Sequence, residues 1–142
     1  RHIDDALSHG AELVLGEVPS GQDRFVAPVL IKNVTEAMLI TQEETFGPVA
    51  PIMQFEHEED ALRIANATPY GLAAYFFTES VRRAWRVGEA LEFGMVGLNT
   101  GSISMEVAPF GGMKQSGLGR EGARQGLDEY LEEKAFHMGG LN

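Results

Sequence analysis

Cysteine is absent from these 142 residues, and positive charge is scarce. Without a thiol, the chain can form neither a disulfide framework nor a thiolate metal site. Lysine and arginine together number 11 against 21 aspartates and glutamates, which gives a formal net charge of −10. Nucleic acids and anionic membrane surfaces bind clustered positive charge, so this balance argues against both as partners.

Long apolar runs are lacking as well. No stretch approaches the roughly 18 residues that would span a bilayer, and the N-terminus has no basic-then-apolar signal pattern. We therefore predict no membrane association and a cytoplasmic location. The sequence starts without methionine, inside what reads as a helix, so we expect a piece of a longer chain.

A metal site is not predicted either. The four histidines are scattered along the sequence, at His2, His9, His57 and His137. His57-Glu58 begins like the zinc-binding motif H-E-x-x-H, but Ala61 stands where that motif needs its second histidine. The G-x-S-x-G pattern of a serine nucleophile elbow is missing too.

The residues that are present alternate between strand-like and helix-like apolar patterns. Hydrophobic content of 44% is ordinary for a globular protein, and 142 residues predict one domain. The predicted elements are, in order, a helix over 2–12, a strand over 12–16, strands within 25–34 broken near Pro28, a strand over 49–55, a helix from Glu58 that ends before Thr68, a strand over 72–77, a helix that starts after the N-cap Ser80 and ends before Gly94, a strand over 95–98, a helix over 120–131 and a strand over 134–138.

The order of elements over residues 49–98 is strand, helix, strand, helix, strand. This order predicts parallel strands joined by right-handed crossovers in an α/β layer. Trp85 falls on the apolar stripe of the second helix, so we predict that it lies in the core. The last predicted strand, Lys134–Met138, has no evident partner and is expected to pair with another segment or subunit.

The loop over Asn99–Gly122 contains six glycines and one aromatic residue, Phe110. Glycine permits positive φ and close backbone approach. We therefore expect that a loop of this composition, next to periodic apolar segments, is shaped around a ligand. It follows the strand over 95–98, and ligands of open α/β sheets bind beyond the carboxyl ends of strands. We predict that this loop forms one wall of a ligand site.

One part of the loop, Gly117–Gly122, matches the dinucleotide fingerprint G-x-G-x-x-G. That fingerprint needs a strand before it and an acidic residue about 20 positions later within a βαβ unit. Lys114–Ser116 precedes it instead, and the sequence ends at Asn142. We interpret this segment as a turn that leads into a helix, not as a dinucleotide site.

Two other segments each allow two interpretations. In the run E-E-T-F-G-P over Glu43–Pro48, a carboxylate could accept hydrogen bonds from the two hydroxyls of a ribose while Phe46 lies against a heteroaromatic ring. Alternatively, the glutamates are solvated and Phe46 anchors the turn. Phe110 is either a wall against a small substrate or a plug of the core. Ser102 and Ser104 offer hydroxyls to an anionic group or to the loop's own backbone.

Taken together, Glu43–Pro48 and the run A-P-F-G-G-M-K-Q-S-G-L-G-R-E over Ala108–Glu121 resemble the NAD(P)-dependent aldehyde dehydrogenase superfamily. The similarity runs through essentially the whole chain, and Asn99–Phe110 is most like the succinate-semialdehyde dehydrogenases. The resemblance implies roughly the last third of such an enzyme. Residues 1–131 would be the C-terminal part of its α/β, parallel-sheet catalytic domain, and 132–142 an oligomerisation strand and tail.

The resemblance also implies roles for single residues. Glu44 would bind the hydroxyls of the nicotinamide ribose of NAD or NADP, and Phe46 would pack beside the nicotinamide. Phe110 would line the aldehyde tunnel, and Ser104 would hydrogen-bond the distal carboxylate of succinate semialdehyde. The terminal strand would pair across subunits, which implies a homo-oligomer.

The mechanism that the resemblance implies is covalent and uses a cysteine thiolate, then a glutamate that activates water. Since this sequence has no cysteine, we assign no catalytic residue to it and expect the chain alone to be inactive. Glu121 would have a structural role. Two alternatives stay open: another substrate, such as glutarate semialdehyde or an uncharged aldehyde, or a non-catalytic domain that binds a partner.

Overall fold

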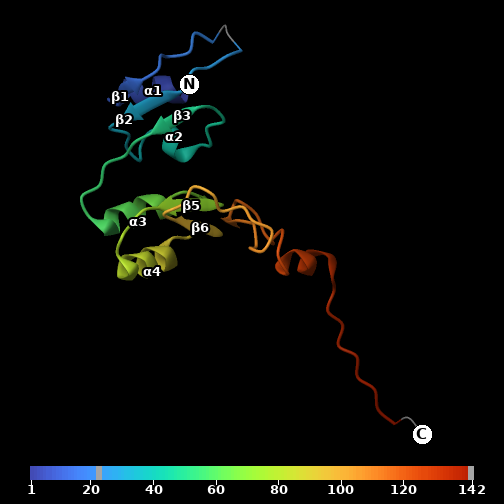
Figure 1. Cartoon of the computed structure of the whole chain (residues 1–142). Helices are drawn as coiled ribbons and strands as arrows, with labels where there is room; N and C mark the ends of the chain where they lie inside the picture. Colours follow the sequence, from blue (N-terminus) through green and yellow to red (C-terminus); the bar gives the residue numbers. More distant parts are fainter. Residues whose placement is uncertain (22–23, 141–142) are drawn as a thin grey trace. The chain divides into compact units, whose positions relative to one another are not determined.

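A boundary at Thr68–Pro69 divides the chain into two units, Arg1–Thr68 and Pro69–Asn142. The computed structural model, drawn in Figure 1, describes residues 1–21 and 24–140. The single domain predicted from length is therefore not observed, because contacts gather within each half of the chain. The main buried apolar cluster lies entirely in the first unit.

The first unit combines a small sheet with short helices. Its elements are α1 (His2–Ser8), β1 (Glu12–Leu15), β2 (Val29–Lys32), α2 (Leu39–Gln42), β3 (Val49–Pro51) and α3 (Glu58–Asn66). The strand order is β1-β2-β3, with β1 antiparallel and β3 parallel to β2. Alternate side chains of β2 enter the core, where Ile31 is fully buried together with Met38, the N-cap of α2.

The second unit contains the parallel pair that the sequence predicts. Its elements are β4 (Tyr70–Gly71), β5 (Ala73–Phe76), α4 (Val81–Ala90), β6 (Met95–Leu98), β7 (Met113–Lys114) and the 3-10 helix η1 (Gln125–Tyr130). Strands β5 and β6 pair in parallel, with Ala73 opposite Met95, and α4 connects them. The hydroxyl of Ser80 accepts a hydrogen bond from the Arg83 amide at 3.3 Å, which confirms the predicted N-cap.

Several predicted strands are shorter than expected or pair differently. Within 25–34 only Val29–Lys32 is a strand, and the strand expected over 49–55 ends at Pro51. That strand, β3, pairs with β2, so the predicted three-stranded parallel layer is not formed in the part of the chain that the structure describes. Strand pairing depends on partners far apart in sequence, which local apolar patterns do not identify.

The C-terminal elements also differ from the prediction. Gly122 and Ala123 both adopt positive φ, at 66° and 48°, which a right-handed helix cannot accommodate, so only the 3-10 helix η1 forms where a helix over 120–131 was expected. Residues 134–138 are not in a strand, because a strand requires a hydrogen-bonded neighbour and this segment has none in the described structure. The pairing of this segment with another subunit stays a prediction, as does the boundary between the catalytic domain and the C-terminal tail after residue 131.

The predicted burial of Trp85 is wrong for this chain. Its side chain is 70% exposed, and Val81 on the same stripe of α4 is 73% exposed, whereas Val87 is buried. Helical spacing identified which residues share a face, but α4 presents only part of that face to the strands beside it.

Candidate functional site

The segment between α2 and β3 carries the first two predicted site residues, Glu44 and Phe46. The residues on either side of Glu44, which are Glu43 and Thr45, both contact His2 of α1, whose side chain is only 13% exposed. The two ring nitrogens of His2 contact different groups: Nδ1 lies 2.7 Å from the Thr45 hydroxyl, and Nε2 lies 3.1 Å from the Glu43 carboxylate. The loop is therefore held at Glu43 and Thr45.

Glu44 lies between Glu43 and Thr45, and Phe46 follows Thr45. Both Glu44 and Phe46 are exposed. Phe46 is 92% exposed, so its ring does not anchor the turn in the described structure, while the exposed Glu44 agrees with a solvated carboxylate. An exposed carboxylate and an exposed aromatic face two residues apart offer hydrogen-bond acceptors and a stacking surface.

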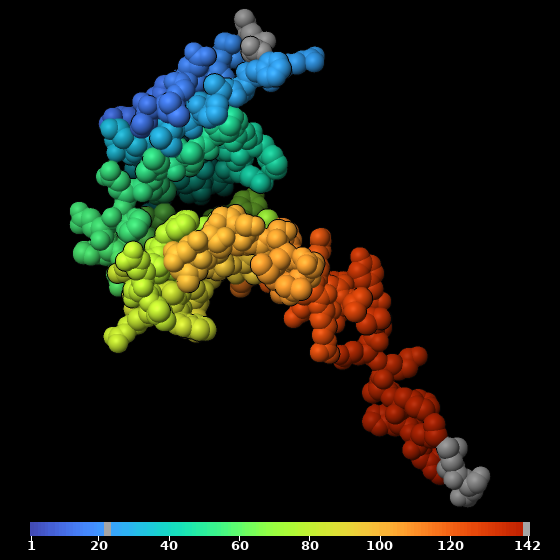
Figure 2. Space-filling view, in the orientation of Figure 1, coloured from blue at the N-terminus to red at the C-terminus, as the bar shows by residue number. Residues whose placement is uncertain are grey.

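In the second unit, the glycine-rich loop starts after β6 and is closed by its own backbone. Phe110 and Glu121 exchange two hydrogen bonds, of 2.8 Å and 2.7 Å, and the Arg120 guanidinium donates to the carbonyls of Gly112 and Gly119. Glu121 acts here through its main chain. The segment over 117–122 forms part of this closure. Only the 3-10 helix η1 follows it, so the longer helix that we expected after this turn is not formed in the described structure. Figure 2 shows the first part of the loop, in orange, on the surface of this unit.

Ser104 and Phe110 are brought together on one cavity of about 290 Å³ in the second unit. Phe110 is 37% exposed, so it lines this cavity and is not a core plug. The remaining lining residues are mostly apolar and come from β5 and the residue before it, from β6 and from the loop: Leu72, Ala73, Tyr75, Met95 and Gly101–Ile103. A cavity with apolar walls and hydroxyls at one side suits a small organic molecule with a polar end.

Tyr75 is a lining residue that the sequence analysis did not single out. It was included in an apolar strand expected to be covered on both faces, yet it is 47% exposed and borders the cavity. The available signal was its phenol, the one polar group within the run L-A-A-Y-F-F. Glu44 and Phe46 share a loop of the first unit, and Ser104 and Phe110 share this cavity of the second.

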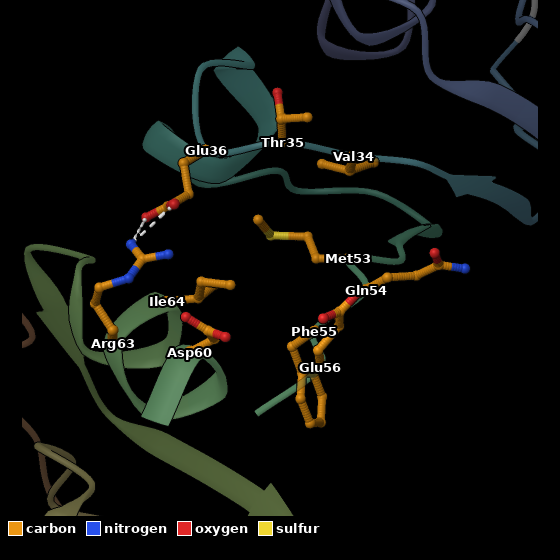
Figure 3. A pocket seen from close by; sticks show the side chains of 10 residues that line it. All are labelled: Val34, Thr35, Glu36, Met53, Gln54, Phe55, Glu56, Asp60, Arg63 and Ile64. Carbon is orange, nitrogen blue, oxygen red and sulfur yellow. Dashed lines mark hydrogen bonds and ion pairs between the residues drawn. The ribbon is translucent and has the colours of Figure 1, made fainter. Parts of the chain in front are cut away.

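A separate hollow in the first unit, of about 710 Å³, contains none of the predicted site residues. It is drawn in Figure 3, where Glu36 and Arg63 point toward one another. One guanidinium nitrogen donates to both carboxylate oxygens, at 2.7 and 2.9 Å. These hydrogen bonds, more than the charge itself, hold the pKa of Glu36 below its usual value of 4.5, and the same contact raises the pKa of Arg63.

This ion pair predicts a small, acid-sensitive contribution to stability. Because the pKa of Glu36 is lowered by folding, the contribution is present above about pH 4.5 and is lost as the pH falls through the depressed value. We expect Glu36→Gln to lower the denaturation midpoint slightly at neutral pH, and the difference from the parent protein to shrink as the pH falls below 4.5. Both side chains are well exposed, so molar salt should shrink the difference. An effect unchanged by both acid and salt would contradict the ionic origin.

Residues 1–21 and 24–140, which the structure describes, contain neither a metal-binding cluster nor a membrane-spanning helix. No group of three or more histidine, aspartate or glutamate side chains there is arranged to hold a metal ion. Likewise, none of the helices there has the length and apolar character needed to cross a membrane.

Comparison with known proteins identifies the family and the fold. The sequence profile described as "Aldehyde dehydrogenase family" matches residues 1–136. The chain belongs to the aldehyde dehydrogenase family. It is 57% identical to "Succinate-semialdehyde dehydrogenase, mitochondrial" of Oryza sativa over all of this chain and 27% of that protein. It is 50% identical to "Probable succinate-semialdehyde dehydrogenase [NADP(+)]" of Sinorhizobium fredii, over 99% of this chain and 29% of that one.

Solved structures of aldehyde dehydrogenases match the fold. The crystal structure of succinate-semialdehyde dehydrogenase from Burkholderia pseudomallei superimposes with a TM-score of 0.85 at 53% identity, covering 91% of this chain and 27% of that one. This confirms the predicted family and the mixed α/β fold class. The chain spans about a quarter of the length of these relatives, somewhat less than the third that we predicted.

Proposed function

We propose that the intact protein is an NAD(P)-dependent aldehyde dehydrogenase that oxidises succinate semialdehyde to succinate. The identity of this chain to proteins named succinate-semialdehyde dehydrogenase, 57% and 50% over essentially its full length, carries the choice of substrate. The cavity beside Ser104 and Phe110 supports it, because a semialdehyde has an apolar middle and a charged end. No residue of this chain is proposed as the nucleophile, since the chain lacks cysteine.

The cofactor assignment rests on the loop over Glu43–Pro48. When bound, the nicotinamide cofactor supplies the hydride acceptor. The exposed Glu44 carboxylate would accept hydrogen bonds from the two ribose hydroxyls, and the exposed Phe46 ring would pack beside the nicotinamide. The Sinorhizobium relative is named as an NADP enzyme, so NADP is a candidate beside NAD.

On the substrate side, Phe110 would form an apolar wall of the aldehyde path, and Ser104 would donate its hydroxyl hydrogen to the distal carboxylate. The terminal segment over 132–142 would pair with another subunit of a homo-oligomer, which would cover the apolar side chains of Phe136 and Met138, now 75% and 62% exposed. A cytoplasmic location stays a prediction; the rice relative is named as mitochondrial.

Replacing Ser104 tests the substrate assignment. In the intact enzyme we expect Ser104→Ala to lower kcat/KM for succinate semialdehyde about tenfold, because a hydrogen bond to a charged group is lost. Hexanal has no carboxylate, so its kcat/KM should stay unchanged and serves as the internal control. Initial rates with succinate semialdehyde, glutarate semialdehyde and hexanal measure both quantities.

Three results would count against the assignment. Equal kcat/KM for hexanal and succinate semialdehyde in the parent enzyme would remove the carboxylate-binding role. A preference for glutarate semialdehyde would replace the substrate by its longer homologue. A selective loss in Ser102→Ala but not in Ser104→Ala would assign the carboxylate to the neighbouring serine, which lines the same cavity.

A further inference from the structure

Helix α1 holds α2 and the loop that follows it, which carries Glu44 and Phe46, at two places. At the start of α2, the Asp5 carboxylate accepts a hydrogen bond from the Leu39 amide at 2.8 Å, which satisfies one free N–H of that helix. Just after the end of α2, His2 contacts both Glu43 and Thr45. Helices α1 and α2 also pack against each other. The loop is therefore fixed to a rigid element within its own unit.

The backbone just after α2 determines which side chains of the loop face α1. Glu43 is extended, with φ −119° and ψ 145°, and successive side chains of an extended chain point to opposite sides. His2 binds side chains 43 and 45 on the inner side. We infer that side chains 44 and 46 then face away from His2. Phe46 is 92% exposed, Thr45 is half-buried, and the Glu43 side chain is itself 46% exposed. Holding the first pair thus sets the direction of the second pair.

We propose that His2 is a positioning residue for cofactor binding, acting through Glu43 and Thr45 on Glu44 and Phe46. This rests on the proposed function of that loop. An imidazole suits the task, because its two nitrogens lie on different sides of one flat ring. Its Nδ1 meets the Thr45 hydroxyl and its Nε2 meets the Glu43 carboxylate at the same time, with the Arg1 guanidinium also 3.2 Å from Nε2. The Arg1 guanidinium contacts the same carboxylate.

The expected consequence is a loss of cofactor affinity without a loss of aldehyde recognition. Without the ring, Glu44 and Phe46 sample several directions, and binding must then order them. We expect His2→Ala in the intact enzyme to weaken the Kd of NAD⁺ or NADP⁺, whichever the parent binds more tightly, by about tenfold. The KM for succinate semialdehyde should stay within about twofold, because His2 contacts residues of the first unit, whereas Ser104 and Phe110 line the cavity of the second.

Two measurements test the inference without using turnover. Calorimetric titration with the oxidised cofactor gives the Kd, and amide hydrogen exchange over residues 43–48 of the cofactor-free enzyme reports whether the loop is held. His2→Ala should show faster exchange there, and His2→Gln, whose amide can still reach one partner, should be intermediate in both readouts. His57→Ala is the matched control, because His57 is an exposed histidine just before α3.

Thr45→Val removes one of the two contacts from the loop side, so the test does not depend on the folding of His2→Ala alone. Unchanged exchange over 43–48 in both variants would overturn the proposal, and so would faster exchange with unchanged Kd. The proposed function has its own test in Glu44→Gln. A weakened Kd in Glu44→Gln with none in His2→Ala would refute only the positioning role. No change in Glu44→Gln would refute the assignment of the loop itself.

Discussion

Glu44→Gln in the intact enzyme is expected to weaken the Kd of the oxidised cofactor by about tenfold to a hundredfold, because hydrogen bonds to a charged acceptor are among the stronger ones. The substitution keeps the size and reach of the side chain. It replaces one of two acceptor oxygens by an NH₂ group and removes the negative charge, so the two ribose hydroxyls can no longer both donate. Glu44 is exposed, so packing should be undisturbed.

Calorimetry on the parent and variant proteins measures this change directly. Glu89→Gln is the matched control, since Glu89 is an exposed glutamate on α4 and the same charge is removed there. The cofactor KM should rise in parallel with Kd, while melting temperatures of the free proteins stay equal. A Kd for Glu44→Gln equal to that of Glu89→Gln would show that the carboxylate does not hold the ribose.

The elements that the sequence predicted well are those set by neighbours in the chain. Ser80 begins α4 as expected, because an N-cap hydroxyl needs only the amide three residues later. The unit β5-α4-β6 forms with parallel strands for a similar reason: its apolar runs and its connecting helix lie within one short segment. Local chemistry is sufficient where the partners are close in sequence.

What the sequence could not predict depends on distant partners. Residues 2 and 45 are separated by most of the first unit, and no pattern in the sequence indicated that His2 would hold the loop. The same limit explains the pairing of β3. This strand pairs with β2, whereas we expected it to share a parallel layer with β5 and β6. For Phe46 and Phe110 the motif allowed two environments each. The exposure of both rings, 92% and 37%, comes only from the structure, and their roles stay predictions.

Gly94 contacts the main chain of Gly71, earlier in the second unit, and of Gly111, later in it. Its replacement carries the largest predicted effect on stability. Gly94 precedes β6, and its amide donates to the Gly71 carbonyl at 2.9 Å. A Cβ built on Gly94 would overlap the carbonyl oxygen of Gly111 and lie 2.8 Å from its carbonyl carbon and 2.9 Å from the Gly112 Cα. These are main-chain atoms, which cannot rotate away as a flexible side chain can.

Gly94→Ala therefore forces the chain after Phe110 to move. We expect the intact enzyme to lose about 1–3 kcal/mol of stability, the usual cost of inserting a methyl group into a packed site. Because Phe110 immediately precedes the displaced glycines, kcat/KM for the aldehyde should fall as well, whereas the cofactor Kd should not. Thermal melting and initial rates measure the two effects separately.

Gly88→Ala supplies a control of opposite sign. Gly88 lies inside helix α4, and a Cβ there would meet nothing within 4 Å. The same chemical change should then stabilise the protein by about 0.5–1 kcal/mol, since alanine loses less conformational entropy in a helix than glycine does. The difference between the two variants isolates the contact with Gly111 and Gly112 from the general effect of adding a methyl group. Equal melting temperatures for Gly94→Ala and Gly88→Ala would mean that the main-chain contact is not formed in the intact enzyme.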